Sequence, residues 1–221
     1  MEKSSYTATG ASDRCIAATS VSHTSVMFTL LARSRSAPPI ASIDAGDLFE
    51  SHARACAVYA SAHRVVCAAP FDAVIVSAGS RAAGRDLVQA HKALDAVAPI
   101  VRDGGTIVLV ARCEDGIGNG EMLDALALGS PAAIEAALRA RFTVGGHTAL
   151  ALLAKTTRLT VLAVTDLDDE ALRLARIERV RSLHDASTRL RAEVGQEARI
   201  AIAPCGASAL YQLGEPADEG L

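Results

Sequence analysis

The chain has 221 residues, of which 50% are apolar and 21% charged, so it can bury a core and wholesale disorder is excluded. Its net charge of −3 argues against a surface for nucleic acids or anionic membranes. Aromatic residues make up only 3% of the chain and Trp is absent, which nearly excludes a platform for stacking bases or sugars.

The N-terminal region gives the weakest pattern. Residues 1–25 lack the basic start and apolar run of a signal peptide, and the apolar run at 26–32 is too short to span a bilayer. That run predicts an edge strand, and a Ser-Ala-Pro-Pro linker follows at 36–39. We therefore expect a poorly structured segment or edge strand over 1–40, an α/β domain over 41–221, and a cytoplasmic protein that does not contact membranes.

Short β-branched runs alternate with helical patterns in the rest of the chain. A helix is predicted over 47–60 and a short strand over Arg64–Cys67. Buried strands are predicted over 71–77, 106–111, 159–164 and 198–203, the second after a break at Gly104-Gly105. Helices are predicted over 84–98, 121–128, 131–141, 147–157, 168–175 and 185–194. This alternation predicts an α/β fold of three layers, with a mostly parallel sheet of about four core strands and helices on both faces.

The turn after the strand 71–77 is a candidate binding site. In open α/β sheets, ligands bind beyond the carboxyl ends of the strands. Gly79 and Ser80 follow this strand directly and are predicted to contact a ligand. The alternative is an ordinary turn between a strand and a helix.

The helix after this turn carries a polar pair. At 100° per residue its apolar side chains form one stripe that faces the sheet, while Gln89 and Lys92 lie three residues apart on the opposite side. An amide and an ammonium group at this spacing can together bind a carboxylate or a hydroxyl group. The alternative is a solvated polar face.

A glycine-rich loop and the histidines carry weaker signals. Gly116 and Gly118 follow two acids with the spacing GxGxG, which favours a pocket rim over a dinucleotide site. No histidines are paired as HxH or HExxH, so no metal site is predicted. His147 follows Gly145-Gly146 and is predicted at the first turn of a helix, as a cap or exposed to solvent. Five scattered cysteines without a CxxC pair indicate small buried thiols.

Two runs, PFDAVIVSAGS and LVQAHKALDAVAPIVRDGGTIVLVARCEDGIGNG, resemble the C-terminal domain of the nickel-dependent lactate racemase family. The stretches AGDLFESHARACAVY, GGHTALALLAK, TVLAVTDL and ARIAIAPCGAS extend the resemblance over about residues 40–212. Its most specific element is Gln-x-x-Lys in a helix after a strand and a Ser-x-Gly turn.

The resemblance implies that Lys92 and Gln89 contact a small 2-hydroxy acid between two domains. In the family, an N-terminal domain holds a nickel–pincer nucleotide, and racemisation proceeds by hydride transfer to that cofactor and back. No cofactor is therefore expected in this chain alone; a separate N-terminal racemase-like domain or a homo-oligomer is the implied partner. His147 and Thr148 fall near the place of an indole that some members use, which makes them candidate rim residues.

The sequence departs from the family in ways that leave three alternatives. The cofactor-binding and catalytic segments are missing, and the turn reads Gly-Ser-Arg-Ala-Ala-Gly where members tend to have Gly-Gly-Tyr-Pro-Leu-Asp. The first alternative is half of a split racemase or a decayed copy. The second is a non-catalytic binding module on the same scaffold. The third, a methyltransferase-like enzyme, is suggested by residues 102–108 but lacks the glycine-rich loop of that class.

Overall fold

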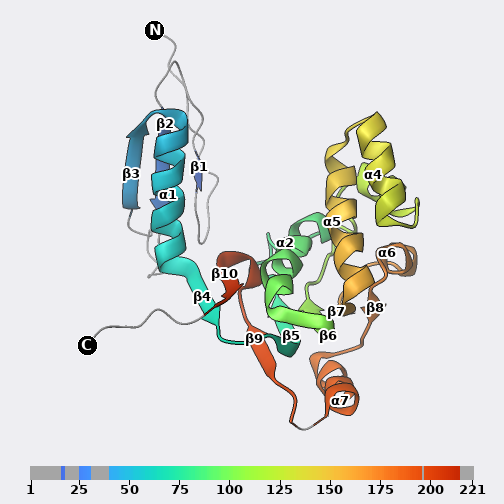
Figure 1. Cartoon of the computed structure of the whole chain (residues 1–221). Coiled ribbons are helices and arrows are strands. Elements are labelled where there is room, and N and C mark those ends of the chain that lie inside the picture. The colour runs from blue at the N-terminus through green and yellow to red at the C-terminus, as the bar shows by residue number, and fades with distance from the viewer. Residues whose placement is uncertain (1–15, 18–24, 31–39, 196, 215–221) are drawn as a thin grey trace. The chain divides into compact units, whose positions relative to one another are not determined.

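A computed structural model describes residues 16–17, 25–30, 40–195 and 197–214 of the chain (Figure 1). The chain divides into two compact units, Met1–Arg64 and Val65–Leu221. The predicted domain boundary after residue 40 falls inside the first unit and stays a prediction. Most of the segment expected to be poorly structured lies outside the described residues.

The described residues of the first unit form a three-stranded antiparallel sheet and one helix. Its strands follow the order β1 (Ile16–Ala17), β2 (Ser25–Leu30) and β3 (Ile40–Gly46), and helix α1 spans Leu48–His63. The strand expected at 26–32 is β2, which pairs on both sides and is therefore the middle strand rather than an edge. The Asp47 side chain accepts hydrogen bonds from two N–H groups of the first turn of α1, which explains why the helix begins there.

The second unit is built on a five-stranded sheet with the order β8-β7-β6-β5-β9, in which every neighbouring pair is parallel. The strands are β5 (Phe71–Ser77), β6 (Val101–Val110), β7 (Thr160–Val164), β8 (Glu178–Arg179) and β9 (Ile200–Ala203). The four predicted core strands are confirmed, and β8 adds a short strand at one edge. A separate two-stranded ribbon pairs β4 (Arg64–Cys67) with β10 (Leu210–Leu213).

The break expected at Gly104-Gly105 is wrong, because β6 continues through it. Phe71 of β5 pairs with Val101, whereas Ala73 pairs with Thr106, so β6 carries extra residues that bulge out of the register. Gly104 has a φ of +72°, which a residue with a side chain rarely adopts. This bulge extends the strand beyond its apolar run, which is why the sequence pattern missed it.

Helices cover both faces of this sheet, as predicted (Figure 1). The larger core lies under one face, where α2, α3, α5 and α6 pack, and the smaller core lies under α7 on the other face. The helices are α2 (Leu87–Val97), α3 (Gly120–Leu126), α4 (Pro131–Ala140), α5 (Val144–Arg158), α6 (Asp169–Ala175) and α7 (Leu183–Val194). Short 3-10 helices span Ala98–Ile100 and Gly206–Ser208. Each α-helix of this unit begins at a side-chain cap: Asp86, Asn119, Ser130, Thr143, Asp168 and Ser182.

The cysteines differ from the prediction of small buried thiols. Of the four in the described residues only Cys113 is buried, whereas Cys56 and Cys205 are exposed. Burial raises the pKa of the Cys113 thiol to about 11, so this thiol stays protonated at neutral pH. Within the described ranges, no helix has the length and apolar character that crossing a bilayer requires.

Candidate functional site

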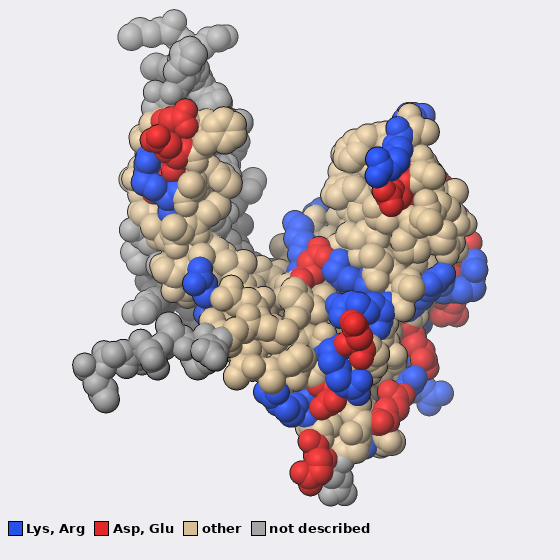
Figure 2. Space-filling view, in the orientation of Figure 1, with Lys and Arg blue, Asp and Glu red and all other residues tan. Residues whose placement is uncertain are grey.

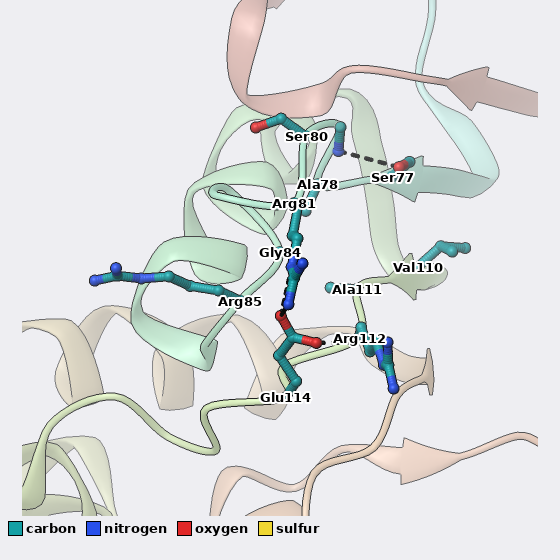
Figure 3. A pocket seen from close by; sticks show the side chains of 11 residues that line it. Ser77, Ala78, Ser80, Arg81, Gly84, Arg85, Val110, Ala111, Arg112 and Glu114 are labelled. Atoms are coloured by element: carbon teal, nitrogen blue, oxygen red, sulfur yellow. Dashed lines mark hydrogen bonds and ion pairs between the residues drawn. The ribbon is translucent and has the colours of Figure 1, made fainter. Parts of the chain in front are cut away.

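A cavity of about 410 Å³ lies at the carboxyl ends of β5 and β6 (Figure 3). The turn after β5 forms one wall, and the segment after β6, which includes Arg112 and Glu114, forms another. Both predicted residues of the turn, Gly79 and Ser80, line this cavity. The cavity therefore occupies the place where open α/β sheets bind their ligands.

Internal hydrogen bonds fix the turn after β5. The N–H of Gly79 donates to the Ser77 hydroxyl at 3.0 Å, and the Ser80 hydroxyl accepts from the N–H of Ala83 at 3.3 Å. Gly79 has a φ of +93°, so this position favours glycine. The two predicted residues thus shape the wall, while its charged groups come from their neighbours.

Three charged side chains, Arg81, Arg112 and Glu114, meet at this cavity; we call them the Arg–Glu cluster. Arg81 donates through Nε to Glu114 Oε1 at 2.7 Å, and Arg112 Nη1 lies 3.4 Å from Glu114 Oε2 (Figure 3). Arg112 is also bound to Asp166 at 2.8 Å, and this hydrogen bond raises the pKa of its guanidinium group. Two guanidinium groups from different segments therefore hold one carboxylate.

The glycine-rich loop docks on the start of α2. The carbonyl oxygen of Gly116 accepts from the N–H of Leu87 at 3.0 Å, and that of Ile117 accepts from the N–H of Val88 at 3.3 Å. A side chain at Gly118 would meet Asp86, whose Cγ lies 2.6 Å from the ideal Cβ position. Neither glycine lines the cavity above. Because the first N–H groups of α2 already have partners, the loop is not a phosphate cradle.

The predicted polar pair lies together on α2. Lys92 Nζ donates to Gln89 Oε1 at 2.9 Å, and Lys92 is exposed while Gln89 is half-buried. Lys92 makes no ion pair with any acid in the part of the chain that the structure describes. The residues of the predicted apolar stripe are all buried: Leu87, Ala90, Leu94, Val97, Ala98 and Val101. The last two lie beyond α2, Ala98 in the 3-10 helix and Val101 at the start of β6.

A second group of titratable side chains, His91, Asp95 and Lys155, was not found from the sequence; we call it the buried cluster. His91 Nδ1 lies 3.3 Å from Asp95 Oδ2, its Nε2 lies 3.3 Å from Lys155 Nζ, and Lys155 also pairs with Asp95 Oδ1. Burial lowers the pKa of His91 to about 4, so the ring is neutral at pH 7. A neutral ring that is protonated on Nδ1 donates to Asp95 and accepts from Lys155. The cluster therefore ties α2 to α5.

The two predicted rim residues near the start of α5 differ in exposure. His147 is exposed and its ring stacks on Phe142, with centroids 6.0 Å apart. Thr148 is buried, and its hydroxyl donates to the Val144 carbonyl oxygen at 3.5 Å.

The described residues contain no group of three or more His, Cys, Asp or Glu side chains that could hold a metal ion. On the face in Figure 2, acidic and basic side chains alternate over the second unit, without a broad patch of one sign. This face does not have the basic stripe that nucleic acid binding requires.

Two solved structures have a fold similar to that of this chain. The chain has a TM-score of 0.69 and 23% identity with the lactate racemase apoprotein from Thermoanaerobacterium thermosaccharolyticum, over 78% of this chain and 43% of that one. It has a TM-score of 0.56 and 17% identity with a structural genomics protein from Thermotoga maritima, over 86% of this chain and 48% of that one. These likenesses show the fold, and the chain spans less than half the length of either structure. A search of curated proteins gave no match.

The sequence also matches the family model of the lactate racemase C-terminal domain. The match runs from residue 66 to residue 211 and includes the cavity, the polar pair and the buried cluster. Since it covers more than half of the chain, this protein belongs to the lactate racemase C-terminal domain family.

Proposed function

We propose that this chain contributes the substrate-contacting domain of a 2-hydroxy acid racemase and works with another domain that carries a nickel–pincer nucleotide. Membership of the lactate racemase C-terminal domain family supports this proposal, as does the fold shared with a lactate racemase apoprotein. The matched chains are more than twice as long as the part that this chain covers, so a second domain is part of the proposal. We also propose that the protein is located in the cytoplasm.

The observation that carries the proposal is the Gln89–Lys92 pair. The ammonium group of Lys92 donates one hydrogen bond to Gln89 and has two further N–H groups for a carboxylate. The amide nitrogen of Gln89 adds donors for a substrate oxygen. Because no described acid neutralises Lys92, its charge is available for an anionic substrate. We assign carboxylate binding to Lys92 and substrate orientation to Gln89.

The residues described here do not fit nickel, since they offer no cluster of metal ligands. The proposal therefore assigns no metal-dependent step to this part of the chain. Its contribution is to bind and orient the substrate, and to close over the cofactor that the other domain holds.

The test is purification of the chain from its native cells under mild conditions, with nickel analysis and a lactate racemisation assay on the co-eluting fraction. We expect nickel and racemisation together in that fraction. Lys92→Ala should lower kcat/KM ten- to a hundredfold, because a charge-assisted hydrogen bond is worth about 1.5–3 kcal/mol. Arg191→Ala is the matched control, because Arg191 is an exposed cation on α7 without an ion pair to a described acid.

Two outcomes would contradict the proposal. A fraction with neither nickel nor racemisation would favour the non-catalytic binding module. Equal losses in Lys92→Ala and Arg191→Ala would show that Lys92 is part of a solvated face.

A further inference from the structure

We propose that the cavity at the ends of β5 and β6 binds a small oxyanion, a carboxylate or phosphate group, between Arg81 and Arg112, and that Glu114 competes with it for Arg81. This site is distinct from the Gln89–Lys92 pair, because neither of those residues lines the cavity. The proposal therefore does not rest on the racemase function.

The geometry of the Arg–Glu cluster is that of oxyanion recognition. Arg81 Nε and Nη2 both lie 2.7 Å from Glu114 Oε1, while Arg112 approaches the other carboxylate oxygen. A planar guanidinium group matches the oxygens of a carboxylate or phosphate, and binds them more strongly than neutral donors do. The Glu114 carboxylate thus marks a position where two arginines hold an oxyanion.

Exposure makes this internal carboxylate replaceable. The side chains of Arg81 and Arg112 are 87% and 72% exposed, while that of Glu114 is 24% exposed. Arginines that are exposed to this degree gain little stability from an ion pair. The Asp166 carboxylate holds Arg112 at the cavity independently of Glu114. An external oxyanion can therefore displace Glu114 without dismantling the site.

Size and location agree with a small-molecule site. A volume of about 410 Å³ lies within the roughly 300–1,000 Å³ range of ligand pockets. Gly79 and Gly84, which carry no side chains, line the cavity beside Arg81. The carboxyl ends of parallel strands are where such folds bind their ligands.

The test is NMR titration of the full chain, labelled with ¹⁵N, with inorganic phosphate and separately with acetate. We expect saturable shifts of the amide signals of Gly79, Ser80 and Gly84 with at least one probe. Glu114→Gln should tighten binding about two- to fivefold, which corresponds to the contribution of an exposed ion pair. Glu135→Gln on α4 is the matched control, since it also removes an acid paired with an arginine but lies outside the cavity.

Arg81→Gln should weaken binding at least as much as Glu114→Gln tightens it. Arg81→Lys, which keeps the charge but loses the planar fork, should also weaken it. Tighter binding of phosphate than of acetate would identify a phosphate group as the ligand. Tighter binding of acetate would identify a carboxylate. The proposal is overturned if neither probe gives saturable shifts at these amides, or if Glu114→Gln and Glu135→Gln behave alike.

Discussion

The Arg–Glu cluster and the buried cluster contain similar charged groups but lie in different environments. In the Arg–Glu cluster the arginine side chains are mostly exposed and Glu114 is 24% exposed. In the buried cluster the side chains of His91 and Lys155 are only 5% and 15% exposed, and the carboxylate of Asp95 reaches the surface. Breaking a buried pair leaves a charge without water, while breaking an exposed pair lets both groups hydrate. We therefore expect the buried cluster to be a fixed link between helices, and the Arg–Glu cluster to exchange its carboxylate as proposed above.

The largest expected effect is that of pH on the buried cluster. The pKa of His91 is lowered from its ordinary value of 6.5 to about 4, with burial as the main cause and Asp95, Lys155 and His147 as the charged groups around it. Between these values the unfolded chain binds a proton that the folded chain does not, so stability falls as the pH falls. Over the whole pH range between the two pKa values, the free energy of unfolding falls by about 3 kcal/mol.

Urea denaturation at pH 7 and at pH 4.5 measures this effect. We expect a smaller loss between the two values in His91→Gln than in the wild type, because the variant lacks the titrating ring. Equal losses in the two proteins would show that other groups cause the pH dependence.

Asp95→Ala should have the next largest effect. Among the described residues, removing this carboxylate leaves the half-buried Lys155 ammonium with the Ala151 carbonyl oxygen and the His91 ring as its acceptors. We expect a loss of about 2 kcal/mol in the free energy of unfolding, less than for a fully buried pair because Asp95 is itself half exposed. A loss below 0.5 kcal/mol, which exposed ion pairs show, would remove the distinction between the two clusters.

Glu114→Gln should change the free energy of unfolding by no more than about 0.5 kcal/mol, since its partners are exposed arginines. Thermal and urea denaturation measure this beside Asp95→Ala. A large destabilisation would show that Glu114 is structural and cannot exchange with an external oxyanion.

Lys92→Ala should have the smallest effect on stability, within about 0.5 kcal/mol, because Lys92 is exposed and bound only to Gln89 among described residues. Its companion Lys155→Met should cost more, although both lysines lie on helices of the same unit. Equal free energies of unfolding for the two variants would mean that the buried contacts of Lys155 do not stabilise the fold.

The features that could be predicted from the sequence are those set by local periodicity. The four core strands follow from short β-branched runs, and the Gln89–Lys92 contact follows from the helical repeat. The bulge at Gly104 depends on pairing with β5, and the buried cluster joins His91 to a lysine 64 residues away. Such contacts depend on tertiary packing, although the His91–Asp95 spacing of four residues was a usable signal for one half of the cluster.

The loop that closes the first turn of α2 has a consequence for how this scaffold can change its ligand during evolution. The carbonyl oxygens of Gly116 and Ile117 accept from the N–H groups of Leu87 and Val88, so these two N–H groups are not available to a ligand. With the roles proposed above for Arg81 and Lys92, we expect single substitutions at these positions to alter ligand specificity without a change in the backbone. The fold and the ligand specificity of such a domain can therefore change independently during evolution.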